Sequence, residues 1–182
     1  MPIPNQAKKV FEGIIFDVYQ WEQEMFDGSK QTFEMLKRKG SVQVLPIIED
    51  KILIAEEEQP HLSKRFGLIG GVQNNNEEPL VAVKREMLEE TGYSSEKWQL
   101  LKTRNQFNKQ DWVISTFIAR DCKKISEPHL DAGEKINPLL VTFDEFMDII
   151  LEENFRSKDL TLDILTLHYQ DKLDEFKKML FD

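Results

Sequence analysis

The chain has 182 residues and a mass of 21.4 kDa, which is room for one full domain with an appendage. Its 33 acidic residues outnumber 24 lysines and arginines, and the formal net charge of -9 disfavours nucleic acid and anionic membranes, because both repel acidic surfaces. The single cysteine excludes an intrachain disulfide and is typical of a reducing compartment. Since the sequence has neither an apolar signal segment nor a run of about 18 apolar residues, we expect a cytoplasmic protein.

Strand-forming residues fill the amino-terminal part of the chain. Aromatic and β-branched side chains are frequent from Val10 to Met35, and Asp27–Gly28 within this stretch is a strong hairpin-turn signal. Two apolar runs, 42–48 and 51–55, follow, with the polar pair Glu49–Asp50 between them. This pattern predicts a second hairpin.

The middle of the chain predicts one helix and further strands. A helix is expected from Pro79 to Thr91, and strands are expected around 98–101 and 112–119. A long polar loop over 121–138 then leads into a strand at 139–143.

The carboxy-terminal tail is predicted to be helical. Thr142, followed three residues later by Glu145, is typical of a capping box at the start of a helix. A second amphipathic helix is indicated by apolar spacing, with the positions Leu160, Ile164, Leu167, Leu173, Phe176 and Leu180. Because strands and helices alternate irregularly, the fold class is α+β, with a mixed sheet covered by helices.

The helix expected at 79–91 carries an acidic face. Pro79 suits its first turn and Gly92 suits the position just past its end. Glu86 and Glu90 are nearly stacked on one side, with Glu89 beside them, and oxygen ligands of this kind suit Mg²⁺ or Mn²⁺. The opposite arc is apolar and predicted to pack, with Leu80, Val81, Val83, Met87 and Leu88. REMLEE taken alone is more typical of an ordinary solvated helix face.

The complete spacing from Gly71 to Tyr93 is far more specific. It matches the Nudix box, G-x5-E-x7-R-E-U-x-E-E-x-G-U, in which U is a bulky apolar residue. Every fixed position is filled, by Gly71, Glu77, Arg85, Glu86, Glu89, Glu90 and Gly92, with Met87 and the aromatic Tyr93 at the U positions. The sequence therefore resembles Nudix hydrolases, which cleave a nucleoside diphosphate linked to another moiety.

The resemblance implies an α/β/α sandwich around a mixed sheet and a divalent-metal site, with Mg²⁺ or Mn²⁺ as cofactor. Glu86 and Glu90 would be the main metal ligands, Glu89 would support or share a metal, and the carbonyl of Gly70 would add a ligand. Arg85 would orient the box glutamates. Glu77, a further box residue, would hold the loop or help to bind metal.

Outside the box, the layout resembles the ADP-ribose and nucleotide-sugar pyrophosphatase branch. It implies an amino-terminal strand region over 1–40 that serves dimerisation and substrate contacts, and a Nudix domain with carboxy-terminal helices over 41–182. The stretch 131–146 resembles that branch's loop with a catalytic glutamate. Glu134 is therefore the candidate general base or additional metal ligand, with a solvated loop acid as the alternative.

The substrate contacts are less determined by the sequence. Trp21 is a candidate for stacking on the base, with core or interface packing as the alternative. Arg65 and Arg104 are candidate phosphate or sugar contacts, with a surface arginine that has no role as the default alternative for each. Where that branch often has Q-Y-R after the hairpin, this chain has Gln59-Pro60-His61. Where the branch often has E-L-P before the glycines, this chain has Gly67-Leu68-Ile69. These departures point to a different terminal sugar or to altered phosphate contacts.

The predicted function is hydrolysis of a nucleoside diphosphate sugar, ADP-ribose or an NDP-hexose, to a nucleoside monophosphate and a sugar phosphate. A homodimer is expected, with no nucleic acid or membrane partner, because the amino-terminal strands would otherwise leave open edges. Two alternatives stay open. One is hydrolysis of nucleoside triphosphates or dinucleoside polyphosphates, and the other is a non-catalytic nucleotide-sugar sensor.

Overall fold

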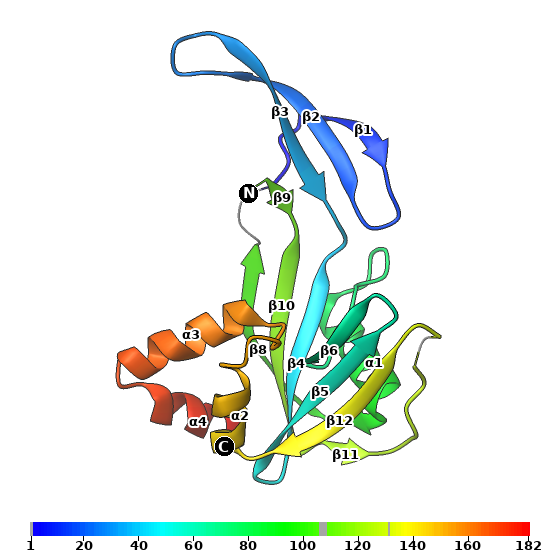
Figure 1. Ribbon diagram of the computed structural model, residues 1–182, viewed down its shortest axis with the longest axis vertical. Coiled ribbons are helices and arrows are strands. Elements are labelled where there is room, and N and C mark those ends of the chain that lie inside the picture. Colours follow the sequence, from blue (N-terminus) through cyan, green and yellow to red (C-terminus); the bar gives the residue numbers. More distant parts are fainter. Residues whose placement is uncertain (1, 106–108, 131) are drawn as a thin grey trace.

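More residues lie in strands than in helices, and helices cover the two faces of the main sheet (Figure 1). The computed structural model describes residues 2–105, 109–130 and 132–182. The elements in chain order are β1 (Lys8–Glu12), β2 (Asp17–Glu24), β3 (Lys30–Lys37), β4 (Ser41–Ile48), β5 (Lys51–Gln59), β6 (Leu62–Gly67), α1 (Pro79–Thr91), β7 (Tyr93–Ser94), β8 (Lys97–Asn105), β9 (Gln110–Asp111), β10 (Val113–Arg120), β11 (Lys123–Lys124), β12 (Lys135–Val141), α2 (Phe143–Ile149), α3 (Lys158–Tyr169) and α4 (Leu173–Phe181).

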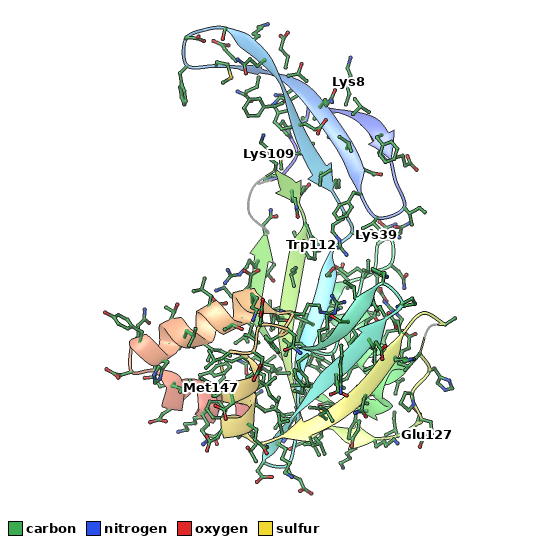
Figure 2. All side chains as sticks on the ribbon, in the orientation of Figure 1. Lys8, Lys39, Lys109, Trp112, Glu127 and Met147 are labelled. Atoms are coloured by element: carbon green, nitrogen blue, oxygen red, sulfur yellow. The ribbon has the colours of Figure 1, made fainter. Side chains whose placement is uncertain are left out.

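The amino-terminal strands form a separate small sheet with the order β1-β2-β3-β9, drawn at the top of Figure 1. Its β2–β3 hairpin turns at Asp27–Gly28, where Gly28 adopts a φ of 80° and Asp27 accepts hydrogen bonds from Ser29. The small sheet joins the main sheet twice, because β3 leads into β4 and β9 leads into β10. Trp112 lies at the second junction (Figure 2).

The main sheet has the order β12-β5-β4-β10-β8, and β6 pairs with β5. β10 and β4 run parallel, whereas the other pairs are antiparallel, which confirms a mixed sheet. The predicted hairpin at Glu49–Asp50 is present between β4 and β5. These two strands pair directly only next to the turn. Farther from the turn, β4 pairs instead with the segment 69–72, through Val44↔Ile69 and Ser41↔Val72.

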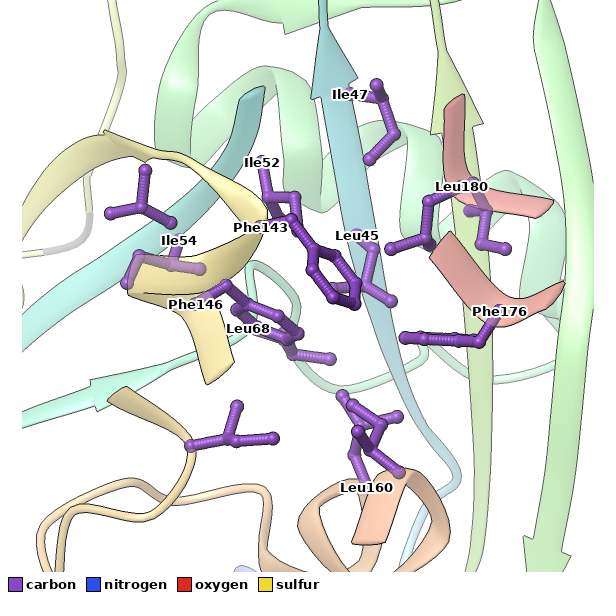
Figure 3. Close-up of a cluster of buried hydrophobic side chains, with 14 of the residues drawn as sticks. Leu45, Ile47, Ile52, Ile54, Leu68, Phe143, Phe146, Leu160, Phe176 and Leu180 are labelled. Carbon is purple, nitrogen blue, oxygen red and sulfur yellow. The ribbon is translucent and has the colours of Figure 1, made fainter. Parts of the chain in front are cut away.

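Two hydrophobic layers lie on opposite faces of the main sheet. On β10, Phe117 and Ala119 pack in the cluster of α1, whereas Ile118 packs in the cluster of α2, α3 and α4 (Figure 3). This alternation follows from the period of two residues along a strand. The resulting α/β/α sandwich in the α+β class confirms the predicted fold.

The helical tail differs from the prediction in one respect. The capping box at α2 is present, with Glu145 N–H donating to Thr142 Oγ1 and Thr142 N–H donating to Glu145 Oε2. The second amphipathic helix, however, is divided into α3 and α4. Asp171 between them has a φ of 57°, and Lys172 N–H bonds back to Leu167 O, so the chain turns while both apolar faces stay on the same core.

Two further predictions are corrected. The polar loop predicted over 121–138 is shorter, because Lys123–Lys124 pairs with β7, and β12 begins at Lys135 and pairs along β5. On α1 the buried face is narrower than predicted. Leu80 and Val81 are 39% and 57% exposed, whereas Ala82 and Val83, the next two residues of the helix, are buried in the core. Within the described residues, no helix is long and apolar enough to span a membrane.

Candidate active site

The helix α1 begins and ends as its sequence predicts. Pro79 occupies the first turn, where its missing N–H costs no hydrogen bond. Gly92 ends the helix with a φ of 73°, and its N–H bonds to Leu88 O over 2.9 Å. Ala82, Val83 and Met87 pack in the core between these two ends and fix the side on which the glutamates project.

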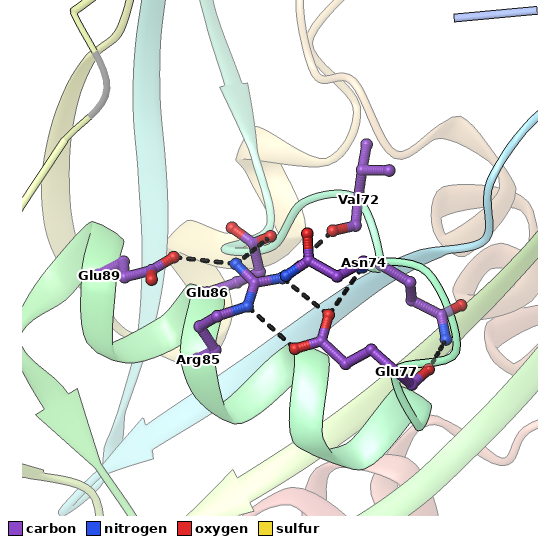
Figure 4. Close-up of polar contacts among 7 residues, drawn as sticks. Val72, Asn74, Glu77, Arg85, Glu86 and Glu89 are labelled. Atoms are coloured by element: carbon purple, nitrogen blue, oxygen red, sulfur yellow. Dashed lines mark hydrogen bonds and ion pairs between the residues drawn. The ribbon is translucent and has the colours of Figure 1, made fainter.

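Arg85 is the centre of a network that ties the preceding loop to the acidic face (Figure 4). Its Nε and Nη2 donate to the two carboxylate oxygens of Glu77, each over 3.0 Å. Its Nη1 donates to Glu86 and Glu89, each over 2.9 Å, and Nη2 also donates to Val72 O. The Glu77 bonds are the main reason why the pKa of Arg85 is raised above its ordinary value and that of Glu77 is lowered. The guanidinium therefore holds the loop and two box carboxylates in one arrangement.

Gly70 and Gly71 let the backbone approach these carboxylates. Gly70 N–H donates to Glu90 Oε2 over 2.9 Å, and a Cβ at Gly70, whose φ is 145°, would lie 2.2 Å from Val42 O. A Cβ at Gly71 would lie 2.5 Å from the carboxyl carbon of Glu86. Any larger residue would therefore displace either β4 or a carboxylate.

The acidic cluster is poorly neutralised. The pKa of Glu90 is raised to about 8, mainly by burial, with further contributions from the charges of Glu86 and Glu134. The pKa of Glu86 is raised for the same leading reason, burial, with contributions from Glu89 and Glu134. Four carboxylates thus lie within electrostatic reach of one another, and such a set of oxygen donors fits a divalent cation. Within the described part of the chain, no three acidic, histidine or cysteine side chains form a ready-made ligand cluster.

The loop that carries Glu134 is fastened to the end of α1. His129 N–H donates to Glu89 O over 2.7 Å, and Ile125 N–H donates to Gly92 O over 2.8 Å. A Cβ at Gly92 would lie 2.0 Å from Ser126 O, so glycine is needed both for the helix end and for the approach of this loop. The contacts explain how a residue 44 positions after Glu90 in the chain reaches the same cleft.

A cleft of about 1030 Å³ gathers most of the predicted site residues. It is lined by Arg65 and by the whole set predicted for metal binding and catalysis, namely Gly70, Arg85, Glu86, Glu89, Glu90 and Glu134. The remaining lining includes cationic side chains from both ends of the chain, such as Arg38 and Arg156, and Trp112 from its middle. Among them, Arg38 lies over the ring of Trp112, 4.2 Å from its centroid.

Trp21 and Arg104 are not among the described residues that line this cleft. Trp21 is 5% exposed in the small sheet, where its ring packs against Phe33 and its Nε1 donates to Gln23. Arg104 donates to Asp163 over 2.6 Å and lines a separate cavity of about 290 Å³ between the main sheet and α3 and α4. A substrate contact by either residue stays a prediction.

Glu57 and Arg156 are among the residues of the cleft wall that sequence reasoning missed. Both line the cleft and form an ion pair of 3.0 Å between Arg156 Nη1 and Glu57 Oε2. They are 99 positions apart, and neither belongs to a motif. An isolated charge in a polar stretch carries no signal of this kind, so only the three-dimensional arrangement reveals the pair.

Comparisons with known proteins agree with the fold and the box. The family model of the NUDIX domain matches residues 37–162, and the chain therefore belongs to the NUDIX domain family. It is 26% identical over 172 residues to the methanol dehydrogenase activator of Bacillus methanolicus, covering 92% of this chain and 93% of that protein. It is also 26% identical over 149 residues to the ADP-ribose pyrophosphatase of Bacillus subtilis strain 168, covering 79% and 80%.

A solved structure is similar over nearly the whole chain. The crystal structure described as an ADP compounds hydrolase superposes with a TM-score of 0.74 at 18% sequence identity, covering 92% of this chain and 95% of that one. At this identity the match establishes the shared fold.

Proposed function

We propose that the protein is a divalent-metal-dependent Nudix pyrophosphatase that hydrolyses nucleoside diphosphate sugars, ADP-ribose or an NDP-hexose. The products would be a nucleoside monophosphate and a sugar phosphate. One observation carries the proposal: the carboxylates of Glu86, Glu89, Glu90 and Glu134 line the same cleft as Arg65. The similarity to proteins named ADP-ribose pyrophosphatase and ADP compounds hydrolase supports the choice of substrate class.

Mg²⁺, with Mn²⁺ as a substitute, is the proposed cofactor. Glu86, Glu89 and Glu90 would hold it, together with the carbonyl of Gly70. When bound, the cation neutralises phosphate oxygens and activates water. The raised pKa of Glu90 supports this assignment, because a buried carboxylate with a like-charged neighbour is stabilised by an adjacent cation.

The residues of the chain take defined parts in the proposed reaction. A water oxygen forms a bond to one phosphorus while the bond from that phosphorus to the bridging oxygen breaks. Glu134 accepts the proton of the attacking water as general base, and Arg65 contacts the phosphate or sugar. Arg85 orients Glu86 and Glu89 through the hydrogen bonds described above.

A turnover panel tests this function. ADP-ribose, an NDP-hexose and ATP are incubated with the protein and Mg²⁺ in ¹⁸O-water, and the products are identified by mass spectrometry. The proposal expects a nucleoside monophosphate and a sugar phosphate, with ¹⁸O on the product whose phosphorus was attacked. Pyrophosphate release from ATP in preference would favour a triphosphatase, and no turnover of any member would favour a non-catalytic sensor.

We also propose that the protein is a homodimer formed through the small amino-terminal sheet. β1 is the edge strand of that sheet, and the residues from β1 to the start of β2 expose apolar side chains. Phe11 and Ile15 are each 60% exposed, and Ile14 is fully exposed. A second copy of the chain would remove this apolar surface and the open strand edge from water.

A further inference from the structure

Two arginines share one buried glutamate on a wall of the cleft. Glu57 of β5 is 4% exposed. Arg65 of β6 donates to its Oε1 over 2.7 Å, and Arg156, from the turn between α2 and α3, pairs with its Oε2 over 3.0 Å. We call Glu57, Arg65 and Arg156 the arginine cluster. Because two guanidinium groups face one carboxylate, the cluster has a net charge of +1.

Backbone pairing holds Arg156 in this position. Its N–H donates to Phe66 O over 2.7 Å, and Phe66 N–H donates to Asn154 O, so the turn runs beside the end of β6 as a parallel bridge between Phe66 and Phe155. The ring of Phe155 is buried in the core. The backbone at Arg156 is therefore fixed before any ligand binds.

The guanidinium of Arg156 lies across a glycine. A Cβ at Gly67 would lie 3.3 Å from Arg156 Nε, and Arg156 Nη2 is 3.4 Å from Leu68 O. The absence of a side chain at Gly67 leaves the space that Arg156, an arginine from a distant segment, fills.

The arginine cluster and the carboxylates lie within electrostatic reach across the cleft. The charge of Arg156 lowers the pKa of Glu90, opposing the rise caused by burial. Arg85, by contrast, has its donors engaged by Glu77, Glu86, Glu89 and Val72 O. The Arg156 side chain is 37% exposed and lines the cleft. The cluster therefore offers a fixed positive charge to an anion in the cleft.

We propose that Arg156, held with Arg65 on Glu57, binds phosphoryl oxygens of the substrate diphosphate. This inference rests on the proposed function, since it names a contact of the same substrate. Glu57 is a positioning residue, because it acts through the two arginines. Guanidinium groups suit this task because their planar forks match the oxygens of a phosphate group.

Binding and kinetics of Arg156 variants test the inference. The ligand for binding is methylenediphosphonate, a hydrolysis-resistant diphosphate, titrated by calorimetry in the presence of Mg²⁺, and the substrate for kinetics is ADP-ribose. R156M is expected to weaken diphosphonate binding and raise KM by roughly 10- to 100-fold, the range for a lost hydrogen bond to a charged group. The kcat is expected to stay within about threefold, because the contact serves the bound substrate and the transition state alike.

Three further variants separate binding from folding. K64M removes a cation from β6, the strand of Arg65. Lys64 pairs with Glu56, and neither residue lines the cleft, so the KM and the diphosphonate Kd of K64M should match those of the wild type. R156K keeps the charge but lacks the fork, and should lie between R156M and the wild type. If R156M does not fold because Glu57 loses one of its two arginine partners, R156Q, whose side-chain amide can still donate a hydrogen bond to Glu57, must show the same loss of binding.

The outcomes distinguish the two proposals. If the wild type hydrolyses ADP-ribose and R156M or R156Q keeps KM and the diphosphonate Kd within about twofold, the role of Arg156 is overturned and the function stands. If the wild type hydrolyses neither ADP-ribose nor the NDP-hexose of the panel, the proposed function fails, and the diphosphonate Kd of wild type and variant still decides the role of Arg156. A wild type that does not bind the diphosphonate overturns it as well.

Discussion

Five of the described glutamates line the cleft, and they differ in how their charge is neutralised. Glu57 has two arginine partners, whereas Glu86 and Glu89 share Arg85. Glu90 accepts a hydrogen bond from Gly70 N–H and lies buried, with its pKa raised to about 8. Glu90, next to Glu86 and Glu134, is therefore the carboxyl whose ionised form the protein stabilises least, and a bound cation would favour that ionised form.

Glu134→Gln tests the proposed general base. The amide cannot accept the proton of the attacking water, so we expect kcat for ADP-ribose to fall by roughly 10²- to 10⁴-fold. Affinity for Mn²⁺, measured by calorimetry, should stay near the wild-type value. Glu127→Gln, an exposed acid in the same loop (Figure 2), serves as control and should leave kcat unchanged. A loss of Mn²⁺ affinity in Glu134→Gln would instead make Glu134 a metal ligand, and an unchanged rate at every pH would remove both roles.

Gly92 and Gly28 have similar backbone conformations, but only Gly92, at the end of α1, lies against the loop that carries Glu134. Gly92 has a left-handed φ of 73° and lies against Ser126 O, whereas Gly28 has a similar φ of 80° with nothing within 4 Å of its Cβ position. The two positions share a conformational constraint, and only Gly92 has a packing constraint in addition. The pair therefore separates the cost of backbone conformation from the cost of a steric clash.

We expect Gly92→Ala to destabilise the protein more than Gly28→Ala. The backbone conformation costs roughly 1–2 kcal/mol at both positions, and the clash with Ser126 O adds about 1–3 kcal/mol at Gly92. Urea unfolding of both variants measures the difference. Gly92→Ala should also lower ADP-ribose turnover, since the loop must move. Equal free energies of unfolding for the two variants would show that the loop moves away from the added Cβ without destabilising the protein.

The contiguous part of the site could be predicted from the sequence, whereas the part assembled by the fold could not. Arg85, Glu86 and Glu90 lie within one helix, so helical periodicity already places them together. Glu57 and Arg156 meet because β6 pairs with β5 and the turn at 154–156 runs beside β6, which no local pattern encodes.

The elements show the same distinction. Hairpins at Asp27–Gly28 and Glu49–Asp50 and the capping box at Thr142 depend on local residues and were predicted. The break between α3 and α4 was not, because Gln170–Lys172 contains neither glycine nor proline, and Asp171 adopts its left-handed conformation within a continuous apolar pattern.

At the scale of the whole molecule, the cleft extends from the box to the junction of the two sheets. Ile15, Arg38 and Trp112 line its end near the amino-terminal sheet, and Glu134 and Ile136 line it near β12. The small sheet thus contributes to the wall of the cleft as well as presenting an apolar edge. Dimerisation and substrate binding are therefore proposed to depend on the same sheet.

Sedimentation equilibrium tests the proposed dimer. We expect a particle of twice the chain mass of 21.4 kDa at micromolar concentration. Phe11→Ser should shift the equilibrium toward the monomer, because it removes apolar surface from the edge strand. Leu162→Ser is a matched control, since both side chains are 60% exposed and Leu162 lies on α3. A wild-type monomer, or equal effects of the two changes, would argue against this interface.

The central claim is that the acidic cluster is a metal site for diphosphate hydrolysis, and the rate of ADP-ribose hydrolysis as a function of Mg²⁺ concentration tests it most directly. The wild-type rate should rise from near zero and saturate with Mg²⁺. Glu90→Gln, which retains the size of the side chain, should fold normally by circular dichroism and lose roughly 100-fold or more of kcat. Metal-independent hydrolysis by the wild type, or near-normal turnover by Glu90→Gln at saturating Mg²⁺, would contradict the claim.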